Sequence, residues 1–165
     1  MSELFKETVA AFQWTKAQRM LMKDPLKIAI DLNSSKYRLN GTAITHICSY
    51  GSAIDGSSAL LQFLLACGAD PDGTDSCGYS GVHLCSLDNK PDKLQILIDK
   101  GANVNLQTNE FKCTALHFAA EESHDLCIEI LLAADCDKNV QDKDGHRPYD
   151  YAKAWNRQMC MQLLK

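Results

Sequence analysis

The sequence predicts an all-α solenoid in which helix pairs stack side by side and hairpin-like fingers project from them. A six-residue motif, clearest at residues 114–119, has further copies that start at positions 42, 80 and 147. The copies start 38, 34 and 33 residues apart, and periods of this size are typical of repeat architectures. An apolar pair and then a turn precede each of the last three copies, beginning at Leu64, Leu97 and Leu131. Motif, pair and turn in constant order indicate one structural unit per period.

Residues 1–37 do not carry the motif. Residues 4–22 are predicted to form a helix with one apolar side, and Pro25 opens a second helix that runs through Leu32. Because a solenoid needs ends with a polar outer face, we interpret 1–37 as a helical N-terminal cap, a degenerate repeat. A separate functional arm is the alternative.

Residues 38–165 are expected to form four repeats, the first with an insertion between its two helices. This insertion, near residues 51–58, is rich in small and polar residues and is predicted to be an exposed, mobile loop. The next-to-last period holds one extra residue within 108–113, which predicts a bulged finger with Phe111 at its tip.

The turns and the core follow from residue type. Gly68 and Gly101 stand where a helix would end with a positive φ angle, and Asp135 takes that place in the following repeat. Thr or Ser at the motif start suits the helix N-cap. Leu116 and Ile128 are expected to cover the interface between neighbouring repeats, with Leu131 and Leu132.

The motif of residues 114–119 and its period resemble the ankyrin-repeat family, over about residues 38–165. The resemblance implies about four ankyrin repeats, with the turns projecting as β-hairpin fingers. It also implies that His83 and His117 are structural hydrogen-bonding residues rather than metal ligands or catalytic groups.

Composition and charge exclude several classes of protein. The chain has 165 residues, 45% of them hydrophobic, and a net charge of −4, which does not favour nucleic-acid or membrane binding. Residues 39–89 contain no Lys or Arg, so this stretch is expected to present an acidic surface that attracts a basic partner. The alternative is a solvated acidic face without a partner.

The cysteines and the N-terminus favour a place inside the cell. Eight cysteines show no CxxC pair and no zinc-ligand spacing, so we expect free thiols in a reducing compartment. Glu3, Lys6 and Glu7 interrupt the apolar region that a signal peptide would need. The expected location is the cytoplasm, the nucleus or both.

No catalytic constellation is apparent. The sequence lacks the GxGxxG and GxxxxGK[ST] phosphate loops and the GxSxG nucleophile elbow. The protein is therefore expected to be no enzyme, with no catalytic, cofactor-binding or metal-binding residue.

Non-enzymatic protein binding, as an interaction module or adaptor, is the function that we expect. A regulatory subunit or inhibitor of a protein kinase, such as a cell-cycle kinase, is the alternative, on architectural similarity alone. A nucleic-acid-associated protein is a third and weaker reading. No feature of the sequence indicates the oligomeric state.

Family geometry places partner binding on the concave face, which is made of finger tips and the exposed ends of the first helix of each repeat. Residues there are not expected to take part in stacking, so large apolar side chains at these positions indicate binding. The acidic neighbours are expected to steer association. The predicted partner-binding residues are Tyr50, Asp75, Tyr79, Leu87, Asp88, Phe111, Glu121, Glu122 and Trp155. For Trp155, covering the open end of the last repeat is the alternative role.

Overall fold

The computed structural model describes residues 43–50 and 57–165, which form eight helices and no strand. The helices are α4 (Ala43–Tyr50), α5 (Ser57–Ala66), α6 (Gly81–Leu87), α7 (Pro91–Asp99), α8 (Ala115–Glu122), α9 (Asp125–Ala133), α10 (Pro148–Ala154) and α11 (Gln158–Leu163). They make four antiparallel pairs. None of these helices is long and apolar enough to cross a membrane.

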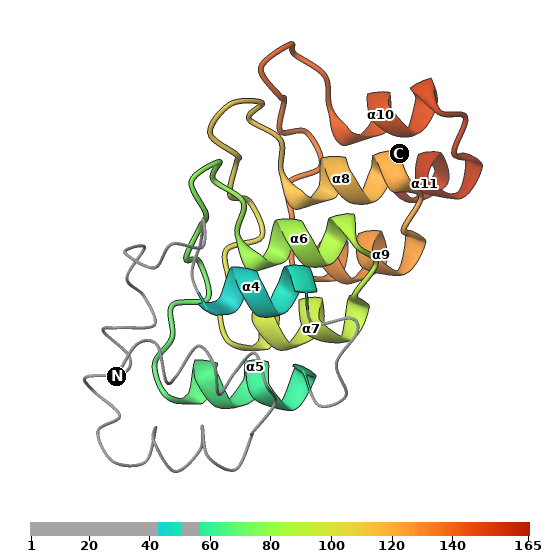
Figure 1. Ribbon diagram of the computed structural model, residues 1–165. Coiled ribbons are helices and arrows are strands. Elements are labelled where there is room, and N and C mark those ends of the chain that lie inside the picture. The colour runs from blue at the N-terminus through green and yellow to red at the C-terminus, as the bar shows by residue number, and fades with distance from the viewer. Residues whose placement is uncertain (1–42, 51–56) are drawn as a thin grey trace.

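The pairs stack in chain order, which confirms the predicted all-α solenoid (Figure 1). The first helices of the pairs, α4, α6, α8 and α10, run in the same direction and pack one against the next. The second helices, α5, α7, α9 and α11, form a parallel row behind them. We call the two rows the inner and the outer helices. The connections between pairs project as fingers beside the starts of the inner helices.

Apolar side chains between the two rows form a continuous core. Leu116, Ile128 and Leu131 are wholly buried, as the sequence predicts, and so is Leu97. Leu132 is only partly buried and packs at the edge of this core. Small residues at 115, 119 and 120 are buried too, and their size lets adjacent inner helices approach closely.

A buried histidine holds the start of each central inner helix. Nδ1 of His83 accepts a hydrogen bond from the Ser80 backbone N–H at 3.1 Å and lies 2.9 Å from the Ser80 hydroxyl. Because Nδ1 accepts from an amide, the proton of the neutral ring is on Nε2, which donates to the carbonyl of Leu106 at 3.0 Å. His117 repeats the arrangement with Thr114 and with the carbonyl of His146. The structural role implied for both histidines is confirmed.

The fingers confirm the extra residue. In the second finger, residues 75–79, the Asp75 N–H donates to the carbonyl four residues later, and the fourth finger, residues 142–146, closes in the same way. In the third finger, residues 108–113, the Thr108 N–H donates to the carbonyl five residues later. Lys112 there has a φ of 56°, in the left-handed region that Gly78 and Gly145 occupy in the other two fingers.

The turns after the outer helices also agree with the sequence. The φ angles of Gly68, Gly101 and Asp135 are 89°, 83° and 56°, so all three lie in the left-handed region. The predicted loop at 51–58 is too long by two residues, because Ser57 and Ser58 belong to α5 and Ser57 is buried. The rest of that loop and the predicted cap at 1–37 lie outside the described residues.

Neutral buried histidines make stability depend on pH. Burial is the main cause that lowers the pKa of His83 from 6.5 to about 4, and it lowers the pKa of His117 as well. In the unfolded chain these histidines take up protons at a higher pH than in the folded protein. The free energy of unfolding should therefore fall as the pH decreases from about 6.5 towards 4, by about 1–3 kcal/mol for His83. Urea unfolding at pH 7, 6 and 5 measures this change. The free energy of unfolding should depend less on pH in His83→Asn than in the wild type. A wild-type free energy of unfolding that stays constant over this pH range would contradict the expectation.

Leu116 should carry a large share of the packing between repeats. Replacing this fully buried side chain by alanine leaves a cavity, so Leu116→Ala should lower the free energy of unfolding by about 2–5 kcal/mol. Chemical denaturation measures the loss. Gln95→Ala on the exposed side of α7 is the control and should change stability by less than about 0.5 kcal/mol. Equal effects of the two substitutions would show that the repeat register is wrong.

Candidate functional site

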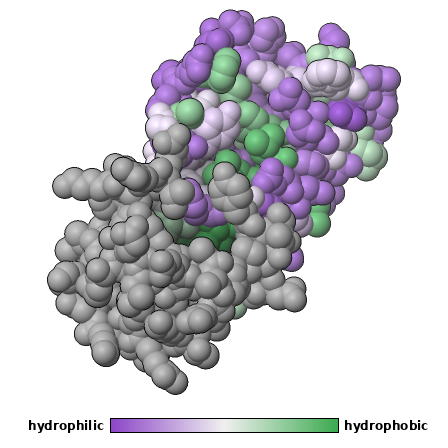
Figure 2. Space-filling model, viewed as in Figure 1, coloured by the Kyte–Doolittle hydropathy of each residue, from purple (hydrophilic) through white to green (hydrophobic). Residues whose placement is uncertain are grey.

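The fingers and the inner helices together form one surface, which we call the inner-helix face. It consists of the second, third and fourth fingers and the exposed sides of α6, α8 and α10. Figure 2 looks onto this side and shows hydrophobic residues in the middle, over α6 and α8, between polar areas. Apart from Tyr50 of α4, the predicted partner-binding residues fall on its fingers and along the ends of its helices.

Phe111 lies exposed on the third finger, as predicted. The side chain is 43% exposed, and the ammonium group of Lys143 lies 4.3 Å from the centre of its ring. This cation–π contact joins the third finger to the fourth. The Lys143 N–H also donates to the Phe111 carbonyl at 2.9 Å, so both the backbone and the ring of Phe111 contact the fourth finger.

Tyr79 packs between repeats, contrary to the expectation that it takes no part in stacking. Its ring is half-buried and lies 5.4 Å from the ring of Phe118 on α8 and 6.0 Å from that of His83, and the rings of His83 and Phe118 are also 6.0 Å apart. Phe118 belongs to the next repeat, so this aromatic contact crosses the boundary between repeats. The sequence pattern missed it because it aligns equivalent positions and does not show which positions touch across repeats.

Tyr151 occupies on α10 the place that Phe118 has on α8. Its ring packs edge-on against His117 at 5.4 Å, and its hydroxyl donates to Oδ2 of Asp142 at 2.7 Å. The hydroxyl is also 3.5 Å from Sγ of Cys113, a buried residue at the end of the third finger. Both Cys113 and Tyr151 therefore support the fold rather than offering free surface.

Asp75 also has a structural task. Its Oδ1 accepts the backbone N–H groups of Cys77 and Tyr79, both at 2.9 Å, and so closes the second finger. Asp142 repeats this pattern in the fourth finger with Asp144 and His146, both at 2.8 Å. Oδ2 of Asp75 takes no part in these two hydrogen bonds, and the predicted role in steering a partner is left to that oxygen.

The C-terminal ends of the inner helices hold the rest of the predicted site. Leu87 is half-buried, while Asp88 is exposed and forms an ion pair with Lys90 at 2.7 Å. Glu121 is half-buried and Glu122 is exposed. Burial, and then the charge of Glu122, raise the pKa of Glu121.

Trp155 follows α10 and is 61% exposed. An indole that covered the end of the last repeat would be buried against it, so this exposure favours a surface role. Tyr50 is the last residue of α4, and its side chain lies outside the described part of the chain.

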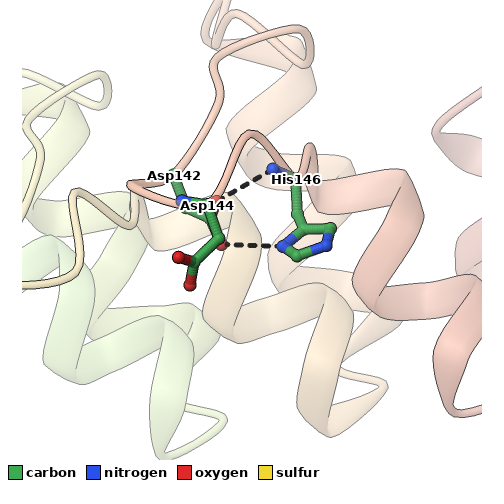
Figure 3. A group of neighbouring side chains, drawn as sticks. All are labelled: Asp142, Asp144 and His146. Atoms are coloured by element: carbon green, nitrogen blue, oxygen red, sulfur yellow. Dashed lines mark hydrogen bonds and ion pairs between the residues drawn. The ribbon is translucent and has the colours of Figure 1, made fainter.

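One group of side chains among the described residues has the spacing of a metal site. Candidate ligand atoms of Asp142, Asp144 and His146 lie within 4.8 Å of one another at the fourth finger (Figure 3). Asp142 is buried, and its oxygens already accept two backbone N–H groups and the Tyr151 hydroxyl, with Nδ1 of His146 at 3.6 Å. Burial acts to raise the pKa of Asp142, but these hydrogen bonds lower it overall. Asp75 accepts the same two backbone N–H groups in the second finger, where the described residues offer no set of metal ligands. Closure of the finger therefore accounts for the arrangement of Asp142, Asp144 and His146.

Burial makes two of the thiols poor nucleophiles. All eight cysteines are unpaired, and six of them are buried. Burial raises the pKa of Cys127 to about 11 and that of Cys136 to about 12, so neither forms a thiolate near neutral pH.

Within residues 43–50 and 57–165, two further large apolar side chains are exposed that were not predicted. Leu126 and Met159 are 53% and 54% exposed and stand 33 residues apart, at the same place near the starts of α9 and α11. The repeat spacing was the available signal for them. They belong to the outer helices and therefore lie apart from the inner-helix face.

Comparison with known proteins gives one consistent result. A family model for ankyrin repeats, in three copies, matches residues 45–142 and 82–165. The chain is 32% identical over 94 residues to the E3 ubiquitin-protein ligase KEG of Arabidopsis thaliana, covering 56% of this chain and 6% of that protein. It is also 32% identical over 139 residues to the mitochondrial disaggregase of Bos taurus, with 82% and 19% covered. For the human ankyrin repeat and SOCS box protein 6, identity is 33% over 92 residues, with 54% and 22% covered. The chain thus spans less than a quarter of the length of these relatives.

Tyr79 and Trp155 should differ in their effect on stability. Tyr79→Ala removes a half-buried ring that packs on the next repeat, so it should lower the free energy of unfolding by about 1–3 kcal/mol. Trp155→Ala removes an exposed ring and should change it by less than about 0.5 kcal/mol. Urea denaturation of both variants measures this. A loss for Trp155→Ala as large as that for Tyr79→Ala would mean that the indole caps the last repeat.

Proposed function

Since the chain belongs to the ankyrin-repeat family, whose repeats are generally non-catalytic modules for protein–protein interaction, we propose that it binds a protein partner on the inner-helix face. The activities of the relatives named above are not transferred to this chain, because each match spans only a small part of those proteins.

The exposure of Trp155 and Phe111 carries this proposal. Both are large apolar side chains on the face made by the fingers and the inner helices, at 61% and 43% exposure. Aromatic side chains bury much area on binding and lose few rotamers, which is why they are enriched among energetically dominant interface residues. With Tyr79 fixed by stacking, these two are the best-placed anchors of the predicted set.

A basic surface on the partner is the complementary part of the proposal. Asp88, Glu121 and Glu122 lie along the helix ends of this face. Opposite charge on the partner would accelerate encounter and fix orientation more than it would raise affinity. Duplex DNA or RNA would be repelled by the same residues, so a nucleic-acid partner is not proposed.

The alternative, a regulatory subunit or inhibitor of a protein kinase, differs from this proposal in the identity of the partner. It rests on architectural similarity alone, and no contact on the inner-helix face favours it. Co-purification with a kinase catalytic subunit, followed by a change in its activity, would support this form of the proposal. Reduced thiols agree with a partner in the cytoplasm or the nucleus.

Single substitutions test the face. A partner recovered with the full chain from native cells should bind Trp155→Ala and Phe111→Ala more weakly, by about 2 kcal/mol or more each. Isothermal titration calorimetry on purified proteins measures the difference.

Glu129→Ala is the matched control, because Glu129 is exposed on the outer helix α9. Binding of the partner should be unchanged in this variant. If Glu129→Ala weakens binding while the two aromatic variants bind normally, the partner occupies the outer helices and the proposal fails.

A further inference from the structure

The C-terminal ends of α6, α8 and α10 form a patch in which equivalent positions lie in rows across three neighbouring helices. One row holds Leu87, Glu121 and Ala154, and the next holds Asp88, Glu122 and Trp155. We call these six residues the helix-end patch. The three helices run in the same direction, so their C-terminal ends lie side by side (Figure 1).

Negative charge accumulates at this patch. The last carbonyls of a helix carry partial negative charge, so cations near a C-terminus stabilise it and anions destabilise it. The last turns of α6 and α8 contain no basic residue, and α8 ends on Glu121 and Glu122. The chain therefore places two adjacent carboxylates where they oppose its own helix.

The surrounding cations do not neutralise the two glutamates. Nζ of Lys90 is engaged by Asp88 and by the carbonyls of Cys48 and Ser49, at 2.6–3.0 Å. Lys153 in the last turn of α10 forms no ion pair within the part of the chain that the structure describes. Neither the Glu121 nor the Glu122 carboxylate has a hydrogen bond or ion pair to any described residue. Glu121 is nevertheless half-buried, which makes a missing counter-charge more costly.

We propose that the helix-end patch is a subsite for an arginine or lysine side chain in an extended basic segment of a protein partner. The cation lies between Glu121 and Glu122, and the indole of Trp155 contacts an apolar side chain of the same segment. This inference rests on the proposed function, since it assumes that a protein partner occupies the inner-helix face. Two carboxylates at the C-terminal end of a helix are locally unfavourable, and such an arrangement on a binding surface is the expected sign of a functional site.

The geometry also predicts the spacing of the two anchors. Axes of packed neighbouring helices lie about 8–10 Å apart. An extended chain advances about 3.3 Å per residue, so the residue that reaches α8 and the residue that reaches α10 should be about three positions apart. A second copy of this chain is a less suitable occupant, because its net charge is −4.

Selection from a random peptide library displayed on phage, with the full chain as target, provides the probe. Enriched peptides should contain an arginine or lysine with an aromatic or aliphatic residue two to four positions away. A synthetic peptide of this kind should bind the double variant Glu121→Gln, Glu122→Gln at least about tenfold more weakly than wild type, equal to about 1.4 kcal/mol or more. Glu129→Gln on α9 is the matched control and should leave its affinity unchanged.

Thermal unfolding gives a second readout that a folding defect would not imitate. Removing both charges from the end of α8 should raise the melting temperature, by about 1–4 °C, while binding weakens. A double variant that is less stable than wild type would show that the glutamates support the fold, and this would overturn the proposal.

Several other results overturn it as well. Enriched peptides without a basic residue, no enrichment of basic peptides over the starting library, or equal affinity for the double variant would each contradict a cation subsite. A dimer in analytical ultracentrifugation that dissociates in the double variant would assign the patch to a second copy.

If the enriched peptides still lose affinity in Trp155→Ala and Phe111→Ala, the inner-helix face remains a binding surface and only the subsite is wrong. If they respond to neither aromatic substitution, the proposed function fails too.

Discussion

The packing of the inner-helix face depends on a neutral imidazole buried at the start of α6 and again at the start of α8. Each ring accepts from the backbone N–H at the start of its own helix and donates to a carbonyl next to or within the following finger. One side chain therefore fixes the start of a helix and the path of the next repeat together. The rings are wholly buried, so losing either partner would leave a polar group without compensation in the core.

The fingers extend this constraint along the solenoid. The Asn109 N–H donates to the Cys77 carbonyl, and the Lys143 N–H donates to the Phe111 carbonyl, which links each finger to the next. At the base of the fingers, the side chains of Asp72 and Asn105 accept amides from the following repeat at 2.7 and 2.8 Å. Interactions between nearest neighbours thus repeat along the chain, as is typical of solenoids. A partner would meet a surface held in place at several points.

The side chains of the inner-helix face are of two kinds: some hold the face together, and others are free on it. Asp75, Asp142 and Tyr151 are occupied by finger closure, and Tyr79 is stacked between repeats. Trp155 and Glu122 have no such task and stay exposed. Since a fold does not fix function, the side chains left free at such positions have to give an ankyrin solenoid its individual specificity.

The sequence by itself determined the period, the helix pairs, the left-handed turn residues such as Gly68 and the longer third finger. These features are local, because each depends on residue type and spacing within one repeat. It also identified the buried side of the repeat, since Leu116 and its equivalents recur in one register. Only the tertiary structure decided which surface residues are free. Tyr79 and Cys113 occupy finger positions that look exposed in the pattern, yet Phe118 and Tyr151 of the next repeats cover them. The physical reason is that burial of a side chain in a solenoid depends on the neighbouring repeat, whose contacting residues lie more than thirty positions away and follow no pattern within a single repeat.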